Sequence, residues 1–306
     1  MGKWSAKMLF SDIIIGGDKA PVVENIRKHI KNGDFNKKAE LDDPVLSDED
    51  ADKAIAKYNK RHANKIVFYL DSRGAVAIIN LGWALIRKRT SFEGVEKLDG
   101  FKKGAIITCN HFNPLDSLFA RALLKKKFHK TPYIVSQETN LAMGGFNGYL
   151  MRRIDMVPLM KRPNYILKTF IPRVKELVEA GEFVQIYPEE ELWFNYRKPR
   201  PCKRGTYLFA AQAKAPVVPI FVEMIDTEKD DNDQFKELKY IVHVLDPIYP
   251  DPKKSDRQNS IDMAKQDYDE RVACYEKVYG KKLDYKFSYS DIAGYDKGLK
   301  KTSSDK

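Results

Sequence analysis

Cysteine is scarce in this 306-residue chain, and long uncharged apolar runs are absent. Cys109, Cys202 and Cys274 are an odd number of cysteines without metal-ligand spacing, so we expect a reducing compartment rather than a disulfide framework. No stretch reaches the roughly 18 uncharged apolar residues that a membrane-spanning helix needs. The N-terminal stretch lacks the apolar core of a signal peptide. These absences predict a cytoplasmic protein without a membrane span.

Glycine-rich phosphate loops and metal-ligand clusters are missing as well. The sequence around Gly144 and Gly148 fits neither a P-loop nor a dinucleotide-binding fingerprint. One histidine, His111, lies among scattered carboxylates with no recognisable ligand spacing, so we expect neither a metal ion nor a bound cofactor. A dyad of Cys109 with His111 is conceivable, but a cysteine in a buried strand is far more common.

Positive charge, by contrast, is in excess. The chain has 54 Lys and Arg against 43 Asp and Glu, a net charge of +11, and its 43% hydrophobic residues are enough for a folded core. Such an excess attracts polyanions, namely anionic lipid, a phosphorylated substrate or nucleic acid. The aromatic and basic residues at 193–200 suit either stacking on bases or a belt at a lipid interface.

The first 90 residues differ in texture from the rest of the chain. Residues 1–65 are polar and charge-segregated, with a helix start at Ser47, and predict a charged, helical N-terminal extension. Residues 66–90 are apolar but interrupted by Asp71 and Arg73, and a basic triplet follows at 87–89. This segment suits either an amphipathic helix at a membrane interface or an ordinary core helix with a polar end.

From about residue 104, short β-branched runs alternate with helical stretches. Strands are predicted at 105–109, 133–136, 156–159, 183–187, 217–222 and 240–245, and helices at 114–128, 165–180, 205–214 and 260–279. The alternation predicts an α/β fold over residues 91–281, in which helices flank a mostly parallel or mixed sheet and an N-terminal helical segment precedes it. Residues 282–306 are expected to form a partly loose C-terminal tail.

The corner after the first of these strands, NHFNPLD at residues 110–116, holds a histidine and an aspartate. Asn113 suits the N-cap and Pro114 the first position of the next helix, so Asp116 falls at the third position and leans back toward the helix start. Its carboxylate can then orient one ring nitrogen of His111 and leave the other free as a general base. The same spacing also suits a capping box, in which Asp116 binds the Asn113 backbone N–H.

The segment HFNPLD resembles the H-x4-D motif of the glycerolipid acyltransferases, the family of 1-acyl-glycerol-3-phosphate acyltransferases. Three further blocks resemble those of the family in the same order: GYLMRRIDMVPLMKRP at 148–163, VQIYPEEELWFNYRKPRPCKRG at 184–205 and APVVPIFVEM at 215–224. Four ordered blocks over about residues 103–225 make the resemblance specific. It implies that His111 and Asp116 are the catalytic residues.

The third block departs from the family pattern. The Gly, Thr, Arg and Ser that usually follow its Pro-Glu pair are replaced by Glu, Glu, Leu and Trp at residues 190–193. This departure leaves the acceptor headgroup open. The missing arginine could be supplied by Arg197, Lys198 or Arg200.

Substrate binding is expected from basic side chains, because phosphate prefers arginine forks and lysine charges. The resemblance implies such roles for Lys161 or Arg162 in the second block and for the turn at 203–205 after the third. Glu189, at a strand end, suits either acceptor hydroxyls or backbone N–H groups. The expected substrate-binding residues are Asn113, Lys161, Arg162, Glu189, Lys203, Arg204 and Gly205.

The resemblance implies an acyltransferase that moves a fatty acyl group from acyl-CoA or acyl-carrier protein to the free hydroxyl of a lysophospholipid. The simplest acceptor is 1-acyl-sn-glycerol 3-phosphate, which gives phosphatidate. The acyl thioester is then a co-substrate, an anionic membrane surface is the docking partner, and no nucleic acid is expected. Two alternatives stay open: an acyltransferase for glycerol 3-phosphate or another lysolipid, and a non-catalytic basic module that binds anionic lipid.

Overall fold

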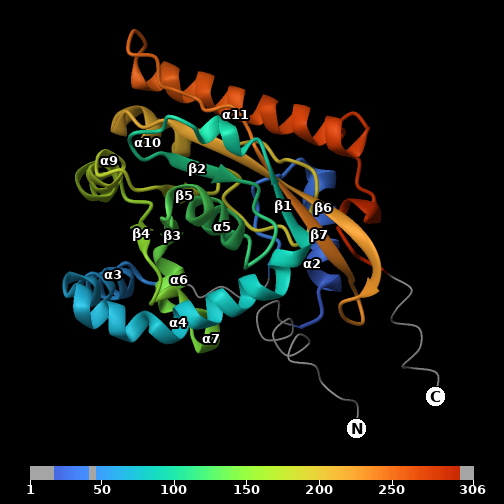
Figure 1. Ribbon diagram of the computed structural model, residues 1–306, viewed down its shortest axis with the longest axis horizontal. Coiled ribbons are helices and arrows are strands. Elements are labelled where there is room, and N and C mark those ends of the chain that lie inside the picture. The colour runs from blue at the N-terminus through green and yellow to red at the C-terminus, as the bar shows by residue number, and fades with distance from the viewer. Residues whose placement is uncertain (1–16, 41–45, 297–306) are drawn as a thin grey trace.

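A seven-stranded sheet forms the centre of the computed structural model, which describes residues 17–40 and 46–296 (Figure 1). The strand order is β1-β7-β6-β2-β5-β3-β4, and all neighbours are parallel except β6 and β7. This confirms the predicted α/β fold with a mixed sheet. The strands are β1 Thr90–Glu93, β2 Ile106–Cys109, β3 Tyr133–Gln137, β4 Met156–Leu159, β5 Val184–Ile186, β6 Val217–Asp230 and β7 Lys236–Val244.

Helices cover both faces of the sheet (Figure 1). The main helices are α2 Ala20–Asn32, α3 Asp48–Ala63, α4 Lys65–Ile86, α5 Ser117–Phe128, α6 Glu138–Ala142, α7 Gly145–Met151, α9 Ile171–Glu179, α10 Arg204–Ala213 and α11 Asp256–Tyr279. A short helix, α8 Pro163–Tyr165, leads through a π-helical stretch, Ile166–Phe170, into α9. Alternate β2 side chains serve the two faces, since Ile107 packs with α5 and Ile106 with α9, α10 and α11.

Three strands, β1, β6 and β7, differ from the prediction by more than one residue, and β7 begins at Lys236 rather than at residue 240. β4 begins and ends where expected, whereas β1 was not predicted; it pairs with β7 at the sheet edge and alternates half-buried with exposed residues. β6 is longer than its apolar part, because its last residues are polar and exposed and continue as the antiparallel partner of β7. Pairing with a neighbouring strand, rather than hydrophobicity, sets the extent of β1, β6 and β7.

The helix α4 is continuous through Asp71 and Arg73, which do not interrupt it. Asp71 forms ion pairs with Arg61 of α3 at 3.0 Å and with Arg153, which follows α7, at 3.1 Å. Its charge therefore stabilises the packing of α4 against these segments. Large apolar side chains on α4 are exposed: Ile66, Val67, Tyr69, Leu70 and Leu81. Among the described helices, none is both long and apolar enough to cross a bilayer.

Part of the predicted C-terminal tail, residues 282–296, packs against the rest of the described chain. Ile292 and Ala293 are buried, Ile292 pairs with Tyr196, and Phe235 pairs with Tyr295 in a second isolated bridge. The same cluster includes the buried face of α2, so both ends of the described chain pack against the 193–196 loop. Residues 297–306 lie outside the described part of the chain.

Candidate active site

The corner with His111 lies at the carboxyl end of β2, in the middle of the sheet. Since β2 and β5 are parallel neighbours, the segment after β5 meets the segment after β2 at the same edge. Asn110 fixes the corner from the other side: its side chain exchanges two hydrogen bonds with the backbone of Val222 in β6, at 3.2 and 2.8 Å. The corner is thus held by both neighbouring strands.

His111 and Asp116 meet as the sequence spacing predicts. The His111 Nδ1 atom lies 2.8 Å from Asp116 Oδ2. Asp116 is buried, while the histidine side chain is 20% exposed. Because a carboxylate only accepts hydrogen bonds, Nδ1 carries the proton and donates it. Within the described residues the other ring nitrogen, Nε2, has no hydrogen-bond partner, so it is the atom that can take up a proton.

Asp116 holds the backbone of the corner as well as the imidazole. Its Oδ2 atom also accepts from the Phe112 N–H at 2.9 Å and the Asn113 N–H at 3.2 Å. The capping contact expected from the sequence is therefore present together with the histidine contact. One carboxylate does both jobs, and the ring and its supporting backbone are fixed together.

The start of α5 differs from the prediction. Asn113 is not its N-cap: the helix begins at Ser117 with Asp116 as N-cap, and residues 113–116 form a tight turn closed by Asp116 N–H donating to Asn113 O at 3.0 Å. The Asn113 side chain instead accepts from the Leu115 N–H at 3.0 Å. The turn replaces the first helical turn because Asp116 is drawn back to the corner. It occupies the N–H groups of Leu115 and Asp116, which are therefore not free for an oxyanion.

Tyr187, which the sequence did not single out, completes the group around the histidine. Its ring stacks on that of His111 with centroids 3.9 Å apart, and its hydroxyl donates to Asp116 Oδ1 at 2.5 Å. Burial and the neighbouring Asp116 charge raise the pKa of Tyr187 well above its usual value, so the hydroxyl stays protonated and remains a donor. The signal that could have found it is its place at the end of the predicted strand 183–187, inside the third block and directly before its Pro-Glu pair.

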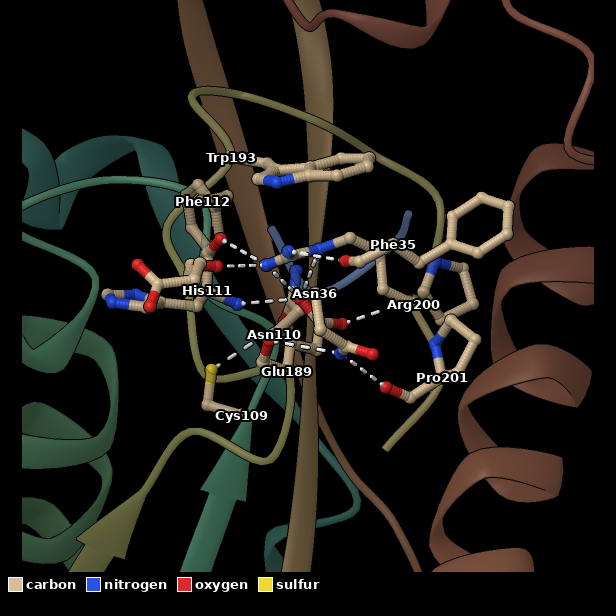
Figure 2. Close-up of polar contacts among 12 residues, drawn as sticks. Phe35, Asn36, Cys109, Asn110, His111, Phe112, Glu189, Trp193, Arg200 and Pro201 are labelled. Carbon is tan, nitrogen blue, oxygen red and sulfur yellow. Dashed lines mark hydrogen bonds and ion pairs between the residues drawn. The ribbon is translucent and has the colours of Figure 1, made fainter. Parts of the chain in front are cut away.

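Glu189 and Arg200 form a buried ion pair behind the corner (Figure 2). The Arg200 Nη2 and Nε atoms lie 2.9 and 3.0 Å from Glu189 Oε2, and the Arg200 backbone N–H reaches Oε1 at 3.0 Å. The pair contacts both polar atoms of the His111 backbone: its N–H donates to Glu189 at 3.3 Å, and its carbonyl accepts from Arg200 at 3.4 Å. Figure 2 shows the His111 ring projecting away from this pair.

The N-terminal segment closes this loop from outside (Figure 2). The Phe35 carbonyl accepts from Arg200 at 3.0 Å, and the Asn36 side-chain amide donates to the Glu189 carbonyl at 3.2 Å. The Trp193 indole donates to the Lys37 carbonyl at 2.7 Å and lies 4.5 Å from the Arg200 guanidinium. Residues 35–37 therefore belong to the support of the corner, a role that the sequence left open.

None of the three cations proposed to replace the missing arginine is free. Arg197 contacts the Met224 carbonyl and pairs with Asp226 at 2.5 Å, and Lys198 pairs with Asp291 at 2.9 Å. Arg200 is committed to Glu189, and Glu189 in turn to Arg200 and the His111 backbone. These charges stabilise the loop. Both carboxylate oxygens of Glu189 already accept hydrogen bonds from Arg200 or from the His111 backbone, so neither is without a protein partner, which a substrate hydroxyl would have to replace.

The other expected substrate-binding residues lie further from the corner. Arg162 pairs with Asp52 of α3 at 2.8 Å, and Lys161 is exposed after β4, three strand spacings or about 14 Å across the sheet from β2. Lys203, Arg204 and Gly205 are exposed at the start of α10. The Lys203 N–H donates to the Pro188 carbonyl at 2.7 Å, so this turn is the nearer of the two to Glu189.

Two cavities flank residues 112–115 and share Leu115 as a lining residue. The larger, of about 590 Å³, lies between α4, α5 and residues 150–155. The smaller, of about 90 Å³, is lined mainly by apolar side chains such as Phe112, Phe119 and Tyr240. Five of the expected substrate-binding residues, namely 161, 162 and 203–205, line neither cavity.

Cys109 does not form a dyad with the histidine. It is fully buried, its Sγ atom lies 3.6 Å from the Asn110 side chain, and burial raises the pKa of its thiol well above the usual value. The thiol therefore stays protonated and unreactive. Within residues 17–40 and 46–296, no group of three or more His, Cys, Asp and Glu side chains is arranged to hold a metal ion.

Residues 89–223 match the model of a protein family described as Acyltransferase. The chain is also similar to the crystal structure of the 1-acyl-sn-glycerophosphate (LPA) acyltransferase PlsC from Thermotoga maritima, with a TM-score of 0.43 and 13% sequence identity over 86% of this chain and 97% of that chain. No curated protein matches the chain. The matched family range includes the whole His111 corner and the Glu189–Arg200 loop.

Proposed function

We propose that this chain, whose residues 89–223 match the Acyltransferase family model, transfers a fatty acyl group from acyl-CoA or acyl-carrier protein to the free hydroxyl of a lysophospholipid. The acceptor that we propose is 1-acyl-sn-glycerol 3-phosphate, and the product is phosphatidate. The observation that carries the proposal is the 2.8 Å contact of His111 Nδ1 with buried Asp116, which leaves Nε2 free. A fixed imidazole with one free nitrogen is what a general base requires.

The proposed reaction uses that geometry. His111 Nε2 removes the proton of the acceptor hydroxyl while the hydroxyl oxygen attacks the thioester carbonyl carbon. The tetrahedral intermediate then collapses, the C–S bond breaks, and the thiolate leaves and takes the proton from the imidazolium. Asp116 stabilises the imidazolium in between. Acyl transfer is direct in this scheme, so no acyl-enzyme forms and no cofactor is needed.

The lipid acceptor requires the enzyme to reach a bilayer surface. The first turns of α4 support this part of the proposal, because Ile66, Tyr69 and Leu70 are 73%, 68% and 57% exposed. The same helix lines the larger cavity with residues such as Phe68 and Val76. Together with the net charge of +11, this favours a cytoplasmic enzyme held peripherally on an anionic membrane, with α4 at the interface.

Replacing the proposed base tests the function directly. His111→Ala is expected to lower the turnover number on the order of 100-fold or more, because it removes general-base catalysis. The matched control is His129→Asn, which changes an exposed histidine at the left-handed C-cap of α5, a conformation that asparagine tolerates. Both variants are assayed by transfer of a radiolabelled acyl group from acyl-CoA to lysophosphatidate, glycerol 3-phosphate and a zwitterionic lysolipid.

The acceptor panel separates the remaining alternatives. Acylation of glycerol 3-phosphate or of the zwitterionic lysolipid alone contradicts the proposed acceptor but keeps the acyl transfer. Equal turnover in His111→Ala and wild type contradicts the proposed base. A protein that binds anionic vesicles but transfers no acyl group to any acceptor is a lipid-binding module rather than an enzyme.

A further inference from the structure

Arg121, on α5, carries a charge that no carboxylate neutralises by contact. Among the described residues, no hydrogen bond or ion pair reaches its guanidinium, although the side chain is half-buried. Burial lowers the pKa of Arg121 from its usual value, and the nearby charge that opposes this effect is Asp155. A partly desolvated arginine without a partner costs stability, so its presence calls for an explanation outside the folded chain.

The Arg121 side chain lies where two cavities meet. One is the cavity of about 590 Å³ beside the His111 corner, and the other has about 330 Å³ and continues along α5. Both are lined by Asn80 of α4 and by Leu118 and Arg121 of α5. The two cavities therefore adjoin along α4 and α5 and form one groove, and Arg121 lines both of its parts.

The groove is predominantly cationic. Beyond Arg121, Lys65 and Arg73 of α4 line the first cavity, and Lys125 and Lys126 of α5 line the second. Arg153 also lines the first cavity, but Asp71 neutralises it. The opposing charge in the lining is Asp155, which forms no ion pair with Arg121. An anion entering the groove thus meets an excess of positive charge and an arginine whose donors have no partner in the described part of the chain.

The groove also lies beside the corner that holds His111. Arg121 follows Asp116 by five residues, about 7.5 Å along the helix axis, and helical side chains lean back over the preceding turn. Pro114 and Leu115, from the turn between His111 and Asp116, line the same cavity. A ligand in this cavity therefore lies next to the corner that holds the proposed base.

We propose that Arg121 binds a phosphate group of a substrate in the groove between α4 and α5. The ligand is either the phosphomonoester of the acyl acceptor or the phosphates of a coenzyme A thioester, which share this chemistry. The site differs from the residues that the sequence assigned to phosphate, since those lie outside both cavities or are paired with carboxylates. The inference rests on the proposed function for the identity of the substrates, but phosphate binding itself does not require turnover.

Direct binding by the purified protein tests the site. Glycerol 3-phosphate and free coenzyme A are titrated separately by calorimetry into wild type, Arg121→Gln, and the control Arg27→Gln, which removes an exposed arginine of α2. We expect Arg121→Gln to weaken one ligand by about 10- to 100-fold, the loss typical of charge-assisted hydrogen bonds. Arg27→Gln should bind like wild type. Arg121→Lys, which keeps the charge but loses the fork, should lie between them.

The ligand that weakens identifies the source of the phosphate. A loss confined to glycerol 3-phosphate assigns the site to the acceptor, and a loss confined to coenzyme A assigns it to the donor. The Michaelis constant for the same substrate should rise by a similar factor. The melting temperature of Arg121→Gln should equal or exceed that of wild type, because among the described residues no hydrogen bond or ion pair of Arg121 is lost and a desolvated charge is removed, so a binding defect cannot be attributed to unfolding.

Two results overturn the proposal. Wild type that binds neither ligand has no phosphate site in the groove, and Arg121→Gln that binds both ligands like wild type shows that Arg121 is not the phosphate ligand. The failure of the proposed function is separate. If Arg121→Gln loses phosphate binding but the wild-type protein transfers no acyl group, the phosphate site is supported and the proposed acyltransferase activity is contradicted.

Discussion

Two arginine–carboxylate pairs lie on either side of the His111 corner. Behind it, Glu189 and Arg200 form an ion pair at 2.9 Å and also hydrogen-bond the His111 backbone. Beside it, Arg121 and Asp155 line a cavity of about 590 Å³ without forming an ion pair. The first pair is almost fully buried, and the second two residues are half-buried. Both pairs consist of an arginine and a carboxylate, but only the first is built to be satisfied within the protein.

This difference separates support from binding. A buried polar network whose members are all hydrogen-bonded fixes one arrangement of the backbone, in this case that of His111. Charges left without a partner around a cavity instead lower stability and are expected where a ligand supplies the missing contacts. The proposed base lies at the boundary, with its backbone in the satisfied network and Nε2 free of protein contacts.

The largest effect is expected from breaking the satisfied pair. Arg200→Met leaves the Glu189 charge buried without its partner, and we expect the free energy of unfolding to fall by about 3–5 kcal/mol. Urea unfolding followed by circular dichroism measures the loss.

Arg27→Met is the control, because the exposed pair of Arg27 with Glu24 contributes little. A double variant that adds Glu189→Gln should recover part of the loss, since it removes the stranded charge. An Arg200→Met variant as stable as the control would mean that the pair does not support the corner.

The sequence predicts the half of the site that is local. His111 and Asp116 are five residues apart, so a turn suffices to bring them together, and helix-start chemistry indicates the turn. Strands β2 to β6 were found because runs of β-branched residues mark buried strands whatever their partners are. β1 has no such run, and its place depends on β7, about 150 residues later.

The other half of the site depends on contacts between distant segments. Glu189 is 78 residues from His111, and Phe35 is 165 residues from Arg200, so no local pattern links them. For the same reason the family blocks suggested Arg162 as a phosphate ligand, although Asp52 of α3 pairs with it. Arg121 reads as an ordinary helix cation in the sequence, because its cavity is created by α4 and residues 150–155.

An intermediate effect is expected at the residue that joins the two sides, Tyr187. Tyr187→Phe keeps the ring stack on His111 but removes the hydroxyl that donates to Asp116. We expect a loss of about 1–2 kcal/mol in the free energy of unfolding and a several-fold lower turnover number, smaller than that of His111→Ala.

The control for this variant is Tyr165→Phe, which removes a hydroxyl that donates to the Pro158 carbonyl at 3.0 Å, outside the corner. Its stability should fall similarly while its turnover number stays that of wild type. If both variants lose turnover equally, or neither does, the hydroxyl of Tyr187 does not position the Asp116 carboxylate for catalysis.

The smallest effect is an increase, rather than a decrease, in the free energy of unfolding, and it concerns Asp155 in the large cavity. Burial raises the pKa of Asp155 above its usual value, so its charged form is disfavoured in the folded state. A raised folded-state pKa favours folding only at low pH, and the contribution is lost as pH rises through the folded pKa. Asp155→Asn should therefore increase stability at pH 7, by at most about 1 kcal/mol, and the gain should shrink as the pH falls toward 4.

Asp155→Asn also sharpens the contrast between the two sides, because it removes the carboxylate that opposes an anion in the groove. The affinity for the phosphate ligand that depends on Arg121 should rise severalfold, whereas the exposed control Asp233→Asn should change neither property. A carboxylate that served stability would give the reverse result, a less stable protein with unchanged binding. Improved stability together with tighter binding would mean that Asp155 is retained for a role in the substrate complex, such as limiting how tightly the phosphate is held.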